Sequence, residues 1–282
     1  FIDLDRFKSV NDRLGHRAGD ELLRATGDRI RSCVGPDDLV GRLGGDEFIV
    51  ISETSPDGEH DLRLADNIVA TLGTPIKIGK DVVTGGGSVG IARYSTQRDA
   101  SALLRDADLA LYEAKAAGGR CVRVFDAAMR GRADDRQEVE IGLRAALRDG
   151  ELDVAYQPLL AVRTGETVGV EALLRWPGRP ELPISDAIEV AESCGLIGQL
   201  GDWVLRRACS DVAELNRRAG SAISVAVNVS VLQLSQPDYC EHVRAALAEC
   251  ELDPSLLTLE LTETFLADDP GRAAQILSQL RS

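Results

Sequence analysis

Three acidic side chains in the first fifty residues have the type and spacing needed to hold a divalent cation. Asp46 and Glu47 directly follow Gly44 and Gly45, and apolar residues flank this stretch on both sides. Two adjacent glycines permit positive φ angles, so the stretch predicts a tight hairpin between two short strands. A purely structural explanation, in which the glycines turn the chain and the acids keep it soluble, also fits these residues alone.

A second acidic strand favours the chemical explanation. Residues 1–5 alternate apolar and acidic side chains, which places Ile2 on one face of a strand and Asp3 on the other. If Asp3 lies beside Asp46 and Glu47, each pair of like charges about 4 Å apart costs about 4 kcal/mol at an effective dielectric constant of about 20. A divalent cation removes that cost. Because all the donors are oxygens, the cluster predicts Mg²⁺ (or Mn²⁺) together with a phosphorylated ligand.

The overall composition indicates a soluble globular protein. The chain has 282 residues, a net charge of −14 and 44% hydrophobic residues, which is long enough for two domains. The acidic charge argues against a nucleic-acid partner, since such proteins carry a basic face. No apolar run approaches the roughly 18 residues of a membrane span. Six cysteines without metal-ligand spacing favour reduced thiols and a cytoplasmic location.

The first residue, Phe1, already lies in a predicted strand. We therefore expect an internal piece of a longer protein, whose absent N-terminal part could anchor it to a membrane.

Periodicity predicts an α/β sandwich over residues 1–125. Apolar residues recur at helical spacing within several segments of this region. The expected helices cover residues 7–14, 19–34, 62–72 and 102–117. The expected strands, besides residues 1–5 and the hairpin, cover residues 75–78, 88–92 and 122–125.

A charged, small-residue stretch at 126–137 predicts a linker, and a connecting helix is expected at 135–148. In the second domain, residues 138–282, strands are expected at 153–156, 167–176, 223–229 and 257–262. Helices are expected at 186–197, 202–219 and 237–250. Strand–helix alternation predicts parallel strands, and four strands amount to about half of an eight-stranded barrel.

Several spaced motifs in the first domain resemble the GGDEF family, the diguanylate cyclases. They occur in the family's order and cover nearly the whole domain: Asp3-Leu4-Asp5, Phe7-Lys8, Asn11-Asp12, Gly15-His16, Gly19-Asp20, the Gly44-Gly45-Asp46-Glu47-Phe48 hairpin and Tyr112-Glu113-Ala114-Lys115. The resemblance implies a nucleotidyl-cyclase-like palm sheet with flanking helices. It also implies that two GTP molecules condense to cyclic di-GMP and pyrophosphate in a homodimer.

The resemblance also assigns roles to single residues. Metal ions are held by Asp3, the Leu4 carbonyl, Asp46 and Glu47, of which the last two are catalytic. Asn11 and Asp20 read the guanine edge, although Asp20 could instead cap a helix. Lys8, a catalytic residue here, and Lys115 meet phosphate charge, and Gly44 and Gly45 let the backbone approach the phosphates.

Two positions depart from the family pattern. The arginine of the usual product-inhibition motif is replaced by Gly35, although its aspartate is present as Asp38. We therefore expect weak feedback inhibition. Arg120 stands one place later than the family's arginine, which puts one phosphate contact in doubt.

The second region resembles the N-terminal half of the EAL family, the cyclic di-GMP phosphodiesterases. The matching motifs are Tyr156-Gln157-Pro158, Glu171-Ala172-Leu173 with Arg175-Trp176, Asn228-Val229-Ser230 and Glu260-Leu261-Thr262-Glu263. The resemblance implies a TIM-like barrel that hydrolyses cyclic di-GMP to linear pGpG. The implied metal ligands are Glu171, Asn228 and Glu260; Gln157 and Arg175 contact substrate, and Glu263 anchors a loop. The family's later aspartates, lysine and glutamate base would lie beyond Ser282.

The sequence thus predicts a protein of cyclic di-GMP turnover. One alternative is a regulatory module in which the first domain binds GTP without useful cyclisation and tunes the second. A weaker alternative is a scaffold that mainly dimerises.

Overall fold

The computed structural model describes residues 1–5, 7–53, 59–95, 99–261, 278 and 280. The chain divides into two compact units, Phe1–Asp135 and Arg136–Ser282. Their junction lies within the segment 126–137. This segment is helical: α5 runs from Ala127 to Asp149, so it begins eight residues before the predicted start at Asp135. Among the described residues, no helix is long and apolar enough to cross a bilayer.

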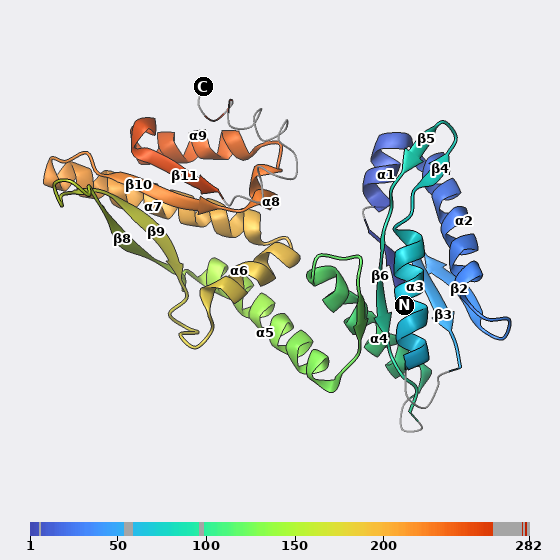
Figure 1. The fold of residues 1–282 in the computed structure, drawn as a ribbon. Helices are drawn as coiled ribbons and strands as arrows, with labels where there is room; N and C mark the ends of the chain where they lie inside the picture. Colours follow the sequence, from blue (N-terminus) through green and yellow to red (C-terminus); the bar gives the residue numbers. More distant parts are fainter. Residues whose placement is uncertain (6, 54–58, 96–98, 262–277, 279, 281–282) are drawn as a thin grey trace. The chain divides into compact units, whose positions relative to one another are not determined.

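The first unit is built on a five-stranded sheet with the strand order β2-β3-β1-β6-β7 (Figure 1). The central strand β1 (Ile2–Leu4) pairs antiparallel with β3 (Glu47–Ile51) and with β6 (Gly87–Ile91). β2 (Leu39–Gly44) continues the sheet beyond β3, and β7 (Val122–Val124) lies parallel to β6. This sheet confirms the predicted GGDEF-type α/β architecture.

The helices of the first unit are α1 (Phe7–Leu14), α2 (His16–Cys33), α3 (Glu59–Leu72) and α4 (Ala100–Ala116). Buried side chains of α2 at Leu22, Thr26 and Ile30 lie one turn apart and face the core. A small hairpin, β4 (Ile76–Ile78) and β5 (Asp81–Val83), packs its buried residues on the same core. The sequence analysis predicted β4 but not β5, which has only three residues.

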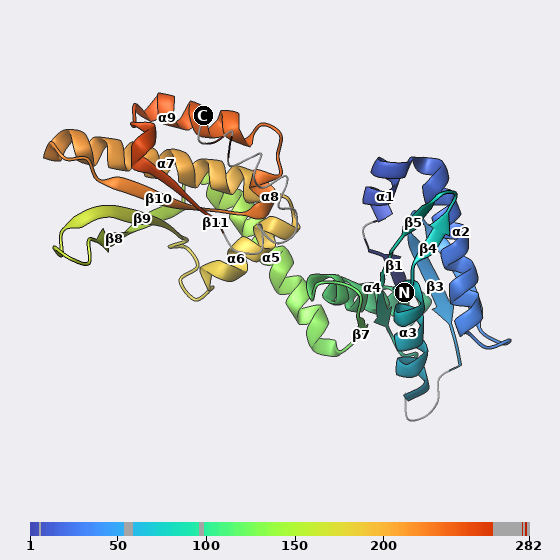
Figure 2. The ribbon, with the colours of Figure 1, turned by 45° about the horizontal axis from the view of Figure 1, so that its top comes forward.

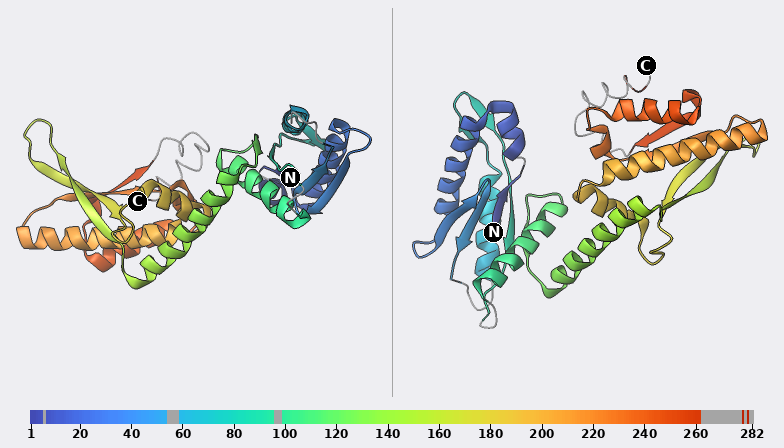
Figure 3. Two further views of the ribbon diagram at one scale, coloured as in Figure 1. Left: turned by 90° about the horizontal axis from the view of Figure 1, so that it is seen from below. Right: turned by 180° about the vertical axis from the view of Figure 1, so that it is seen from behind.

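The second unit has a four-stranded sheet with the order β11-β10-β9-β8. Strands β9 (Thr167–Arg175), β10 (Ser224–Val229) and β11 (Leu257–Leu261) are parallel, as predicted. Strand β8 (Asp153–Leu160), however, pairs antiparallel with β9, so the prediction of parallel strands was wrong for this pair (Figure 3). Only residues 161–166 connect these two strands, and a parallel crossover needs a dozen residues or more.

Helix α7 (Ile197–Ala219) runs along the sheet of the second unit (Figure 2). It presents buried residues at helical spacing, among them Leu200, Val204 and Ala208, and ends at Gly220 in a left-handed conformation (φ 62°). The unit also contains α6 (Ile184–Ser193), the single turn α8 (Val231–Leu234), α9 (Tyr239–Cys250) and a 3₁₀ turn at Pro254–Leu256. Together they bury one large apolar core.

Candidate functional site

The predicted carboxylates of the first unit lie on two neighbouring strands and on the turn that adjoins them. Asp3 on β1 lies directly opposite Glu47 on β3, so both side chains point to the same face of the sheet. Asp46 occupies the turn just before Glu47. Asp3 is buried, with 7% of its surface exposed. Burial raises the pKa of the Asp3 carboxyl, contact with Lys115 lowers it, and the charges of Asp46 and Glu47 raise it further.

The hairpin predicted at the glycine pair is present between β2 and β3. Gly45 has a positive φ of 49°, which a glycine adopts without steric cost. The Arg42 guanidinium donates two hydrogen bonds to the Gly45 carbonyl, with N···O distances of 2.9 and 2.7 Å. The arginine therefore holds the turn that places Asp46 beside β1.

Lys115 reaches this site from α4. Its Nζ lies 2.7 Å from Asp3 Oδ2, across 112 positions of sequence. The sequence analysis predicted that Lys115 contacts phosphate. In the structure its ammonium group forms an ion pair with the buried Asp3 carboxylate. The sequence carried no signal for this ion pair, because nothing local links α4 to β1.

The two residues expected to read guanine lie on neighbouring helices. Asn11 is on α1 and Asp20 is on α2, and the two helices pack on each other. A Cβ atom at Gly19 would overlap the Asn11 amide oxygen, so this glycine allows the close approach. Asp20 does not cap a helix, because α2 begins at His16. Lys8 is exposed one turn before Asn11.

The two positions that depart from the family pattern have local roles. The Gly35 N–H donates to Asp38 Oδ2 at 2.7 Å, and Arg31 pairs with Asp28 instead of with Asp38. Arg120 has a positive φ of 52°, and its N–H donates to Asp5 Oδ2 and to Ser88 Oγ, both at 3.1 Å.

The donor set of the first unit fits a divalent cation by chemistry. Two carboxylates lie opposite each other, a third occupies the adjacent turn, and the buried Asp3 already attracts a cationic group. Within the described ranges, however, no group of three or more His, Cys, Asp or Glu side chains is gathered closely enough to hold a metal ion. The partner of Asp3 in this arrangement is Lys115.

The second unit gathers its predicted polar residues on one sheet face. Gln157 lies opposite Glu171, and Asn228 lies opposite Glu260. Glu171 is aligned with Ala226, two positions before Asn228, so alternation places all four side chains on the same face. Asn228 Nδ2 donates to Glu171 Oε1 at 2.8 Å.

The remaining predicted residues of the second unit are less closely placed. Arg175 follows Glu171 by four positions on β9, but its Nη1 donates to the Leu174 carbonyl at 2.8 Å. Glu263 lies outside the described residues. The described part of this site therefore consists of two carboxylates and two amides in a row across four strands.

Comparison with known proteins agrees with both halves of this description. Residues 1–121 match the family model for the diguanylate cyclase GGDEF domain, and residues 142–282 match the model for the EAL domain. The chain belongs to these two families and contains them in tandem. Together, the two domains indicate a protein of cyclic di-GMP metabolism.

Two curated relatives come from Pseudomonas aeruginosa. The cyclic di-GMP phosphodiesterase NbdA is 37% identical over 100% of this chain, which spans 36% of NbdA. The bifunctional diguanylate cyclase/cyclic di-GMP phosphodiesterase MucR is 36% identical over 99% of this chain, which spans 41% of MucR. The GGDEF–EAL structure of Vibrio cholerae LapD aligns with 99% of this chain and with 66% of the LapD chain, with a TM-score of 0.58. The two sequences are 17% identical, so this similarity supports the fold alone.

Proposed function

We propose that the first unit condenses two GTP molecules into cyclic di-GMP and releases pyrophosphate. The observation that carries this proposal is the placement of Asp3 opposite Glu47, with Asp46 in the adjoining turn. Carboxylates on two neighbouring strands and the adjoining turn suit the metal ions of a metal-bound triphosphate.

Each residue has a defined task in this proposal. Asp3, the Leu4 carbonyl, Asp46 and Glu47 would hold Mg²⁺ (or Mn²⁺), which when bound neutralises charge on the triphosphate. Lys8 and Lys115 supply positive charge to the phosphates. Asn11 offers an amide donor and acceptor to guanine, and Asp20 accepts from its N–H groups. Gly44 and Gly45 leave room beside the phosphates.

Cyclisation by this route needs a homodimer. One such site holds one GTP, so two copies must face each other to join two nucleotides. Holding both reactants in place can contribute about 7–11 kcal/mol of the barrier. We therefore expect the specific activity to rise with protein concentration; a flat specific activity below the measured dimerisation constant would contradict the dimer.

The decisive experiment is pyrophosphate release from GTP with Mg²⁺, together with identification of the nucleotide product. Cyclic di-GMP formed in step with pyrophosphate supports the cyclase. Saturable GTP binding without pyrophosphate release supports the second candidate, a regulatory GTP-binding module that tunes the EAL domain. That candidate is favoured by the Lys115–Asp3 ion pair, which engages a carboxylate that the metal would need.

For the second unit we propose that the EAL domain to which it belongs hydrolyses cyclic di-GMP to linear pGpG. The common sheet face of Glu171, Asn228 and Glu260 supports their role as metal ligands, and Gln157 and Arg175 would contact the substrate. Glu263 would anchor a neighbouring loop. Conversion of cyclic di-GMP to pGpG by the protein tests this proposal, and loss of that conversion in Glu171→Gln is the expected result.

A further inference from the structure

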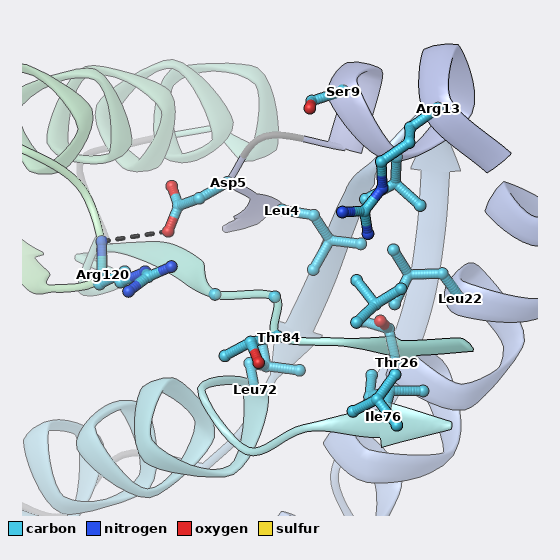
Figure 4. A pocket seen from close by; sticks show the side chains of 15 residues that line it. Leu4, Asp5, Ser9, Arg13, Leu22, Thr26, Leu72, Ile76, Thr84 and Arg120 are labelled. Atoms are coloured by element: carbon cyan, nitrogen blue, oxygen red, sulfur yellow. Dashed lines mark hydrogen bonds between the residues drawn. The ribbon is translucent and has the colours of Figure 1, made fainter. Parts of the chain in front are cut away.

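The first unit contains a cavity in addition to the carboxylate site. It has a volume of about 330 Å³ and lies between α1, α2, the end of α3, the β4–β5 hairpin and the loop that leads into β6 (Figure 4). Leu4, Leu22, Leu72 and Ile76 form the apolar part of its wall, and Asp5, Ser9, Thr84 and Arg120 contribute polar groups. A volume of this size accommodates a small organic molecule.

This cavity is separate from the carboxylate site. Its lining includes Leu4 and Asp5 but none of the carboxylates Asp3, Asp46 and Glu47, nor Lys115. On α1 the cavity is lined by Ser9 and Arg13, four positions apart and therefore on one side of the helix. None of the predicted nucleotide contacts Lys8, Asn11 and Asp20 lines it.

One buried polar atom on the cavity wall has no hydrogen-bond partner among the described residues. Thr26 is completely buried, and among the described residues its Oγ1 makes no hydrogen bond. It lies on the wall between Leu22 and Ile76 (Figure 4). Because a buried hydroxyl without a partner is unfavourable, this position favours a ligand that brings a hydrogen-bond acceptor to Thr26.

A cation stands beside this hydroxyl. The Arg13 guanidinium reaches into the cavity between Leu4 and Leu22 (Figure 4). Within the described part of the chain, its side chain makes no ion pair or hydrogen bond. Arg13 therefore offers a positive charge with no ion-pair partner among the described residues, beside the apolar part of the wall.

The opposite end of the cavity carries a carboxylate, Asp5, and a guanidinium, Arg120. A Cβ atom on Gly86 would lie 2.7 Å from Arg120 Nε and 3.1 Å from Asp5 Oδ2. The guanidinium and the carboxylate therefore both lie next to Gly86. The unusual backbone of Arg120 (φ 52°), held by Asp5 and Ser88, directs its side chain there. The anionic group of a ligand thus belongs at Arg13.

We propose that this cavity binds a small organic anion with an apolar body, whose anionic group pairs with Arg13 and accepts a hydrogen bond from the Thr26 hydroxyl. The apolar body would lie against Leu4, Leu72 and Ile76.

Phenyl phosphate serves as the probe, with neutral benzamide and inorganic phosphate as controls for charge and for the apolar body. Binding to the full chain is measured by equilibrium dialysis. We expect saturable binding of phenyl phosphate, at least tenfold weaker in Arg13→Gln because a charge-assisted contact is lost. Thr26→Val should weaken binding about three- to tenfold, since it removes one hydrogen bond and little volume. Arg24→Gln, on the exposed side of α2, should bind like the wild type.

Thermal unfolding separates binding from folding. Thr26→Val removes an unpartnered hydroxyl and should unfold no lower than the wild type, so weaker binding by this variant reports the lost contact. If Arg13→Gln binds phenyl phosphate as tightly as the wild type, or if Lys8→Met abolishes binding, the probe binds elsewhere. Either result would overturn the proposal. Equal binding of benzamide or of inorganic phosphate, or no saturable binding at millimolar concentration, would overturn it as well.

Discussion

The two candidate sites place carboxylates on neighbouring strands but compensate their charge differently. In the first unit Asp3 is buried and paired with the Lys115 ammonium group at 2.7 Å. In the second unit Glu171 has a neutral partner, the Asn228 amide at 2.8 Å, and Glu260 is exposed on the same sheet face. The first site thus carries its own counter-charge, whereas the second leaves its carboxylates to solvent.

Because of this difference, we expect the site residues to contribute more to the stability of the first unit than to that of the second. A buried carboxylate without a counter-charge is strongly unfavourable, so Lys115 contributes to the fold whether or not a metal binds. An exposed carboxylate and amide contribute little to the fold. Substitutions should therefore affect both stability and chemistry in the first unit, but mainly ligand binding in the second.

The largest expected effect is on chemistry in the first unit. Asp46→Asn removes one charge with little change in volume, and we expect pyrophosphate release from GTP to fall at least about 100-fold because the metal loses a ligand. Asp37→Asn, an exposed acid before the same hairpin, is the matched control and should keep wild-type turnover. Wild-type turnover of Asp46→Asn with Mg²⁺ present would refute the assigned role.

The second prediction concerns metal binding by the second unit. In an Asp46→Asn background, which weakens the first site, Glu171→Gln should lower Mn²⁺ affinity about tenfold or more, as loss of one ligand predicts. Electron paramagnetic resonance of free Mn²⁺ measures the affinity. Glu166→Gln, in the exposed turn between β8 and β9, is the control. Equal affinities of the two variants would remove Glu171 from the ligand set.

Much of this arrangement follows from local sequence. The hairpin at Gly44 and Gly45, the alternation around Asp3 and the parallel strands β9 to β11 were predicted correctly, because turn chemistry and periodicity are properties of short stretches. The start of α5 was missed because the charged, small residues after Ala127 resemble a linker. The antiparallel β8–β9 pair was missed because the rule for alternating elements was applied where no helix intervenes.

Long-range contacts could not be predicted in this way. The Lys115 ammonium group pairs with Asp3, and the Arg120 backbone N–H donates to Asp5, through the packing of α4 and its following loop on the sheet. The Thr26 hydroxyl, which has no hydrogen-bond partner among the described residues, also could not be predicted, because a threonine in a helix normally has a backbone acceptor within reach. The roles proposed for the site residues remain predictions.

The third prediction tests the stability difference directly. Lys115→Met should lower the free energy of unfolding of the first unit by about 1–2 kcal/mol, less than for a fully buried pair because Lys115 is partly exposed. Asn228→Ala should cost the second unit about 0.5 kcal/mol or less. Both tryptophans, Trp176 and Trp203, lie in the second unit, so their fluorescence reports that unit alone, whereas circular dichroism reports both.

In urea unfolding, Lys115→Met should shift the transition seen by circular dichroism and leave the tryptophan transition unchanged. Added Mg²⁺ should stabilise this variant more than the wild type, since a cation at Asp3 would replace the missing ammonium group. A wild-type unfolding midpoint for Lys115→Met, or a loss confined to tryptophan fluorescence, would show that the ion pair does not stabilise the first unit.

The smallest expected effect concerns feedback by product. Gly35 stands where an arginine would bind product phosphate bidentately, and the Asp38 carboxylate accepts a hydrogen bond from the Gly35 N–H at 2.7 Å. Asp38→Ala should therefore lower stability by only about 0.5–1 kcal/mol and leave cyclic di-GMP inhibition of pyrophosphate release unchanged, because there is little inhibition at this site to lose. Asp37→Ala provides the matched control for the turn. If the first unit binds cyclic di-GMP tightly and Asp38→Ala abolishes that binding, then this site works without its arginine, and the counter-charge it needs comes from another residue.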